Sequence, residues 1–245
     1  MKLLLTFLIF FFSILMIGQN ISKGKIVYKA SLNTELYILQ LMYDTEMSDF
    51  LRNVRLQKAL ESKPMNFFLL FDNNESLYHA EFDLNMQRDM GLGMNLTGMV
   101  AGVDYICYSN LKTKENFRQS FWMDNIIINV KPIVWELTKE TKKIDEYTCY
   151  KATTILKEEK ENGGYLSDFI VAWYTNQIPV PFGIQNFGGL PGLALELTQN
   201  TERGILFYKA TNIELNSNEK ILIKKPKGKG ISHEEFIEII RRPRK

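Results

Sequence analysis

The sequence predicts an α+β protein dominated by β-structure: one curved, mostly antiparallel sheet of about ten or more strands, half-barrel-like, with one amphipathic helix near the N-terminus and a short C-terminal helix. Many short segments alternate apolar and polar residues with a period of two, and the turns between them are rich in Asn and Gly. One early stretch instead has helical spacing. A chain of 245 residues, 45% of them hydrophobic, is long enough to bury one core of ordinary size.

The first strand shows the pattern most clearly. Within Lys25–Leu32, Ile26, Tyr28 and Ala30 share one face and Lys29 lies on the other, which indicates a half-buried strand. Further strands are predicted at 66–72, 76–82, 104–110, 116–122, 126–130, 133–138, 147–156, 169–175, 193–198 and 205–215. About a dozen short β segments with turns rich in Asn and Gly suggest an antiparallel domain.

The helix is predicted over Asp44–Ser62. Phe50 and Leu51 belong to an apolar set with helical spacing, and Asp44 or Thr45 is the expected N-cap.

The N-terminus has the pattern of a secretory signal peptide. Lys2 precedes the uncharged run Leu3–Ile17, and Gly18 follows it. This run is shorter than the roughly 20 apolar residues of a membrane-spanning helix, although an uncleaved signal anchor is the alternative. We therefore expect a signal peptide at 1–18, a β-rich domain at 19–223 and no transmembrane span after cleavage. The expected location is the periplasm, with secretion or outer-membrane association as alternatives.

The C-terminal stretch 224–245 is a basic tail with eight Lys or Arg against three Glu. Ser232 and Glu235 have the spacing of a capping box, which predicts a short helix. The tail is either solvated or a contact for anionic lipid or an acidic partner. The whole chain, at +2, has no charge excess that would indicate nucleic-acid binding.

The densest unusual segment is Trp173–Thr198, which contains Gly-Gly-Leu-Pro-Gly-Leu. This string, its lead-in at Trp173–Pro179 and the segment Trp135–Thr153 resemble the GLPGLI family of exported proteins of Gram-negative bacteria. The resemblance covers nearly all of the chain after the leader, although Ala194 stands where the family has isoleucine. It implies export and architecture, but the family has no settled biochemical activity and so supplies no reaction.

The glycines and proline of this motif permit two interpretations. One is a tight structural corner, because glycine allows positive φ and close backbone approach while proline fixes its own φ. The other is the rim of a groove for a ligand or partner, because aromatic and Gly/Pro-rich loops on rigid sheets often carry recognition. The candidate binding residues are Trp173, Tyr174, Pro179, Gly183, Phe187, Gly189, Leu190, Pro191, Gly192 and Leu193.

Two further groups of residues carry hypotheses. Cys107 and Cys149 could form a disulfide in an exported protein, or stay separate buried thiols. Met86, Met90 and Met94 could bind Cu(I) through their thioethers, although the same spacing suits packing residues or an apolar flap. We expect no cofactor and no metal.

The sequence contains no G-x-S-x-G, H-E-x-x-H, C-x-x-C or Walker A motif. Our leading hypothesis is a noncatalytic periplasmic module that binds an envelope protein partner or an apolar, lipid-like ligand. One alternative is an accessory to outer-membrane uptake machinery. The others are a hydrolase using carboxylates or His79, and a copper-handling protein.

Overall fold

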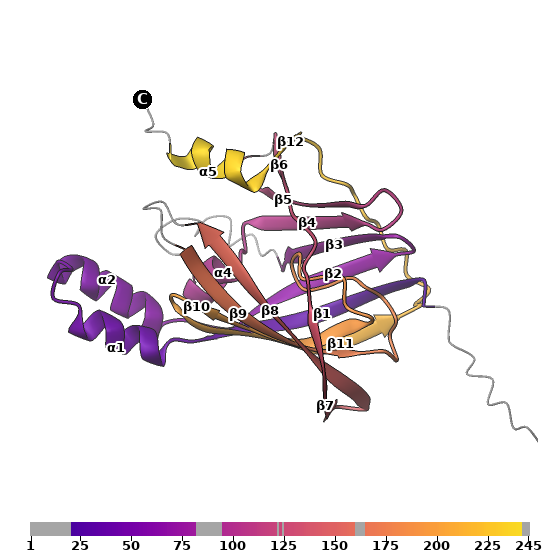
Figure 1. Cartoon of the computed structure of the whole chain (residues 1–245), viewed down its shortest axis with the longest axis horizontal. Coiled ribbons are helices and arrows are strands. Elements are labelled where there is room, and N and C mark those ends of the chain that lie inside the picture. The colour runs from indigo at the N-terminus through magenta and orange to yellow at the C-terminus, as the bar shows by residue number, and fades with distance from the viewer. Residues whose placement is uncertain (1–20, 82–94, 122, 124, 160–164, 242–245) are drawn as a thin grey trace, which may run out of the picture.

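One open sheet of 12 strands forms the body of the protein in the computed structural model (Figure 1). The structure describes residues 21–81, 95–121, 123, 125–159 and 165–241. The strands are β1 Lys23–Asn33, β2 Met65–Asp72, β3 Glu75–Ala80, β4 Tyr105–Asn110, β5 Glu115–Ser120, β6 Ile126–Asn129, β7 Glu136–Ile144, β8 Tyr147–Glu159, β9 Tyr165–Thr175, β10 Leu193–Thr201, β11 Gly204–Leu215 and β12 Lys229–Ile231. The helices are α1 Glu35–Tyr43, α2 Asp49–Leu60, α4 Leu96–Val100 and α5 His233–Arg241.

The predicted fold class is confirmed. The strand order is β12-β6-β5-β4-β3-β2-β1-β11-β10-β9-β8-β7, and the ladders are antiparallel except for β12, which pairs with β6 in parallel. The sheet curves strongly, so that β8 and β9 run across β1 and β2 in the view of Figure 1. Its two ends, β12 with β6 and β7 with β8, are separate edges and do not close into a barrel.

The core fills the inner face of this curved sheet. Ile26 and Tyr28 on β1 and Phe67 and Phe71 on β2 are fully buried, as the alternation of these strands predicts. On the inner face, the Tyr28 hydroxyl donates to the Ala194 carbonyl on β10, two strands away in the sheet, over 2.8 Å. Burial raises the pKa of Tyr28, so the hydroxyl stays protonated and keeps this bond.

The early helical region differs from the prediction. Helix α2 begins at Asp49 with Ser48 at the N-cap position, so the predicted caps at Asp44 and Thr45 are wrong. The side chain of Asp44 instead accepts hydrogen bonds from the backbone N–H of Glu46 and Met47, and so stabilises the turn between two helices. The sequence prediction missed α1 because its residues are apolar on nearly every side and show no single stripe.

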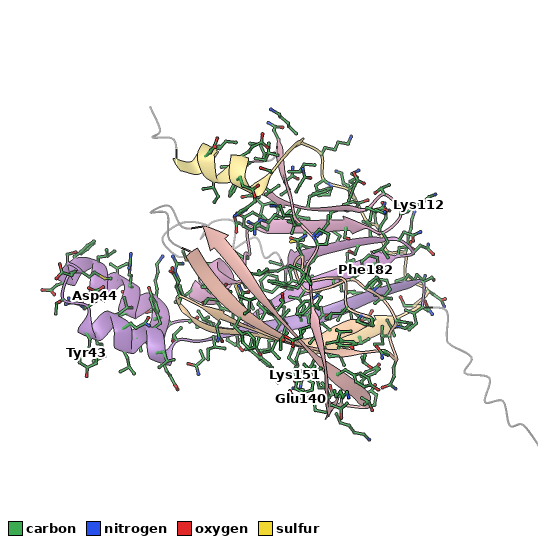
Figure 2. The ribbon with its side chains drawn as sticks, viewed as in Figure 1. Tyr43, Asp44, Lys112, Glu140, Lys151 and Phe182 are labelled. Carbon is green, nitrogen blue, oxygen red and sulfur yellow. The ribbon has the colours of Figure 1, made fainter. Side chains whose placement is uncertain are left out.

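Helices α1 and α2 form a hairpin that projects away from the sheet (Figures 1 and 2). Its surface carries large exposed apolar side chains: Leu36, Leu39, Met42, Tyr43, Phe50, Leu51 and Leu60.

The C-terminal region joins the sheet. Strand β12 adds three residues beside β6, and Phe236 of α5 packs with Ile128 and Ile231. The capping box is confirmed: the Ser232 N–H donates to the Glu235 carboxylate over 2.7 Å and the Glu235 N–H donates to the Ser232 hydroxyl over 3.1 Å. This part of the predicted basic tail is therefore packed structure and not a frayed, solvated end.

The strand predicted at 133–138 is also displaced. Strand β7 begins at Glu136, and residues 130–135 form a β6–β7 linker outside the sheet. Pro132 has no N–H for a ladder, and the Trp135 indole N–H donates to the Gly188 carbonyl over 2.9 Å. The linker is thus held over the inner face and does not extend β7.

Two predictions fall outside the described residues. These are the signal peptide at 1–18 and the methionine segment with Met86, Met90 and Met94. Within the described part of the chain, no helix has the length and apolar character needed to cross a membrane.

Candidate functional site

The Gly-Gly-Leu-Pro-Gly-Leu motif lies at the end of an inner loop, residues 176–192, that connects β9 to β10. This loop packs into the curved sheet, because Ile178, Val180, Phe182 and Ile184 are all buried in the main core. Figure 2 shows Phe182 in the middle of the molecule, where its ring lies 5.7 Å from that of Phe71. The loop therefore supplies core side chains, unlike the usual surface connection.

The glycines of the loop are placed where its backbone approaches neighbouring backbone. A Cβ on Gly192 would lie 2.0 Å from the Thr175 carbonyl oxygen, and one on Gly183 would lie 2.0 Å from the Phe187 carbonyl oxygen. Gly189 has no such neighbour but has a φ of +86°, which disfavours other residues. Close packing thus requires two of these glycines and backbone conformation requires the third.

The predicted binding residues do not gather around one recess. Tyr174, Gly183, Phe187, Leu190, Gly192 and Leu193 are buried, Pro179, Gly189 and Pro191 are exposed, and Trp173 is partly buried. The Trp173 ring lies 4.4 Å from the Lys142 ammonium. Among these ten residues, Phe187 lines the large cleft described next.

A cleft of about 980 Å³ lies between the two ends of the sheet. Its lining comes from β5 and β6 at one end of the strand order and from β7, β8 and β9 at the other. The inner loop, the β6–β7 linker and the start of α5 complete it. The curved sheet leaves this space because it stops short of the closure that would turn it into a barrel.

The linker forms one wall and is fixed at two points. The Thr154 hydroxyl of β8 donates to the Val134 carbonyl over 2.8 Å, and the Trp135 indole holds the linker to the inner loop. The volume lies within the range of small-molecule sites, roughly 300–1,000 Å³.

The lining is mainly aliphatic and aromatic on the β8–β9 side. Val134, Ile155 and Phe169 are 86%, 56% and 43% exposed, which are high values for large apolar side chains of a folded domain. The remaining apolar residues of the lining are Ile128, Val130, Pro132, Ile133, Trp135, Leu156 and Phe187. A solvent-open, mostly apolar recess of this kind suits an apolar ligand.

Polar groups gather at the opposite end of the cleft, near α5. Lys131 and Glu234 form an ion pair of 3.0 Å. Hydrogen bonding to its own backbone N–H, followed by the Lys131 ammonium, lowers the pKa of Glu234 to about 2. Arg118 and His233 lie in the same lining, with 3.4 Å between the Arg118 Nη2 and the His233 Nδ1.

The cysteines and His79 lie away from this site. Cys107 on β4 and Cys149 on β8 are free buried thiols on strands that do not pair, so the disulfide hypothesis is wrong for this structure. Burial raises the pKa of Cys107 to about 12 and that of Cys149 to about 11, so neither is an activated nucleophile. His79 contacts the Ala80 carbonyl and the Phe68 ring and does not line the cleft.

The described residues offer no group of three or more His, Cys, Asp or Glu side chains that could hold a metal ion. The cleft can bury the apolar surface of a ligand, and at one end it offers cationic hydrogen-bond donors. Sequence reasoning missed Arg118, Phe169 and the β6–β7 linker as site residues. Each belongs to a segment with an ordinary strand pattern, and only the curvature of the sheet brings them together.

Comparisons with known proteins agree on the architecture. A family model described as "N-glycanase peptide, N-terminal domain" matches residues 101–231, which include most of the cleft lining. A solved structure of PNGF-II in space group P21 has a TM-score of 0.51 at 17% identity and covers 90% of this chain and 34% of that chain. The structure of PNGF-II in space group C2 has a TM-score of 0.51 at 16% identity and covers 90% and 33%.

This chain thus spans about a third of the length of the PNGF-II chains, and at this identity the likeness concerns the fold alone. LprF from Mycobacterium bovis matches at a TM-score of 0.33 and 8% identity, covering 86% of this chain and 92% of that chain. A TM-score this low supports no conclusion about this chain. No curated protein matches the chain.

Proposed function

The chain belongs to the family described as the N-glycanase peptide N-terminal domain, and from this premise we propose that it is a noncatalytic binding module whose cleft holds an apolar ligand. One observation carries the proposal: a recess of about 980 Å³ is lined mainly by apolar side chains, several of which are solvent-exposed. Leaving such surface in water costs roughly 25 cal/mol per Å², and an apolar ligand removes that cost.

We propose binding rather than the N-glycanase reaction named in the family description. The carboxylates of the cleft are Glu136, which is exposed, and Glu234, which is paired with Lys131. Both carboxylates are exposed, and neither is buried among apolar side chains as the acid of a hydrolase commonly is. The match to an N-terminal domain of a longer protein also fits a module that serves a neighbouring activity.

The compartment and the family resemblance belong to the same proposal. The leader-like residues 1–18 support export, and we place the module in the cell envelope, in the periplasm. The Gly188–Leu193 string and its Trp173–Pro179 lead-in support the resemblance to the GLPGLI family. The exposed apolar face of the α1–α2 hairpin supports the alternative ligand, an envelope protein partner that binds to that face.

A fluorescent probe tests the proposal. N-phenyl-1-naphthylamine, a neutral apolar dye, is expected to bind the wild type saturably with a rise in fluorescence. Leu156→Glu should weaken its binding about 10-fold or more, because it places a charge in the apolar wall. Leu156 is partly exposed, so the fold should tolerate the change.

Phe50→Glu is the matched control, because Phe50 is 80% exposed on the hairpin and lies outside the cleft. It should leave binding of the dye unchanged. Loss of binding in Phe50→Glu and not in Leu156→Glu would move the apolar site to the hairpin. Absence of saturable binding to the wild type would overturn the proposed function.

A further inference from the structure

Arg118 is a cation of the cleft with hydrogen-bonding capacity to spare. It lies on β5, opposite Ile128 of β6, and contributes to the cleft lining. Its Nε is buried and has no hydrogen-bond partner among the described residues. A guanidinium has five N–H donors, and a buried donor without an acceptor costs about 1–3 kcal/mol.

The neighbours of Arg118 include a carboxylate, Asp104, but none within ion-pair distance among the described residues. Its guanidinium carbon lies 4.8 Å from the centroid of the Tyr105 ring, and its Nη2 contacts His233. The charge of Arg118 acts on Asp104, but the Asp104 carboxylate accepts a hydrogen bond from the Ser120 hydroxyl. Among the ion pairs of the described residues, none contains Arg118.

Among the described residues that line the cleft, Arg118 is the Lys or Arg side chain that belongs to no ion pair. Lys131 is paired with Glu234. Glu136 is an exposed carboxylate at the start of β7, on the side of the cleft supplied by the second half of the sheet. The cleft therefore has a positive group at the β5 end and an apolar wall along β8 and β9.

We propose that the cleft binds a long-chain carboxylate, with the carboxylate on Arg118 and the alkyl chain along Ile133 and Leu156. This rests on the proposed function and assigns its ligand class. A planar guanidinium pairs with a carboxylate through two parallel N–H···O bonds. One unpaired guanidinium balances one negative charge, which favours a carboxylate over a doubly charged phosphate monoester.

Displacement of N-phenyl-1-naphthylamine by decanoate, decanol and decyl phosphate tests the assignment. For the wild type, decanoate should displace the dye at a concentration about 10- to 100-fold lower than decanol does, since the ligands share a chain and differ in the head group. Arg118→Gln should raise the decanoate concentration needed to displace the dye to that needed for decanol. The decanol concentration should stay unchanged. Arg203→Gln, at an exposed arginine outside the cleft, is the matched control and should behave as the wild type.

The outcomes separate the two proposals. Equal displacement by decanoate and decanol in the wild type would overturn the carboxylate assignment and leave the apolar site standing. Stronger displacement by decyl phosphate than by decanoate would also overturn the carboxylate assignment, because it would identify a phosphate as the preferred head group. Failure of all three ligands to displace the dye would overturn the proposed function. The wild-type comparison requires no variant, so misfolding of Arg118→Gln would not prevent a decision.

Discussion

Gly192→Ala is expected to lower the free energy of unfolding by about 2–4 kcal/mol. The added Cβ would lie 2.0 Å from the Thr175 carbonyl oxygen and 3.1 Å from that of Ile178. Both atoms are backbone, so relief requires the chain itself to move. Movement there would also disturb the hydrogen bond of 2.9 Å that the Leu193 N–H donates to the Ile178 carbonyl, where β10 begins. Urea unfolding followed by circular dichroism measures the change.

Two glycines serve as controls. Gly230→Ala adds a Cβ with its closest neighbour at 3.4 Å, in ordinary contact, and should change stability by less than about 0.5 kcal/mol. Gly189→Ala meets nothing within 4 Å but has a φ of +86°, so it should cost about 1–2 kcal/mol. If Gly192→Ala is as stable as Gly230→Ala, the inner loop is not the close-packed element described here.

Phe182→Ala should be the most destabilising side-chain truncation in the inner loop, with a loss of about 3–5 kcal/mol. The ring is 3% exposed and packs against Phe71 of β2, so its removal leaves a cavity between the loop and the sheet. The surrounding backbone is tied by hydrogen bonds, such as the 2.8 Å bond from the Gly189 N–H to the Pro181 carbonyl, and cannot easily collapse into the space.

Phe50→Ala makes the same chemical change at a side chain that is 80% exposed. It should alter the free energy of unfolding by less than about 0.5 kcal/mol, measured in the same urea titration. Equal effects of the two substitutions would mean that Phe182 contributes no more than a surface residue. The inner loop would then be a surface connection and not part of the core.

The strands could be predicted from sequence because each one carries its own signal. β1, β2 and β11 alternate buried and less buried side chains over much of their length, and this period is visible without any tertiary information. The capping box of Ser232 and Glu235 is equally local, and its hydrogen bonds are formed. Interactions within a few residues of sequence are the ones that a single sequence displays.

The inner loop could not be placed in the same way. Its Gly/Pro-rich composition predicts a turn, which is correct, but the same composition fits an exposed rim. Whether Phe182 points inward depends on the curvature of the sheet around it, since its partner Phe71 lies on β2, far away in sequence. The buried positions of Gly183 and Gly192 follow from the same long-range packing.

The cleft was beyond the reach of sequence for a related reason. Arg118 and Leu156 come from opposite parts of the strand order, and each lies in an unremarkable strand. They face one recess because the sheet bends and then ends without closing. No spacing in the sequence shows that these two strands face each other across the cleft. Helix α1 was missed for a different reason, because its surface is apolar without periodicity.

A crystal structure of the protein with 12-bromododecanoate tests the central claim most directly, because anomalous scattering locates the bromine at the end of the alkyl chain. We expect the bromine peak inside the cleft, on the apolar side formed by Ile133 and Leu156. A peak on the α1–α2 hairpin, or a cleft that stays free of the ligand at saturating concentration, would contradict the account.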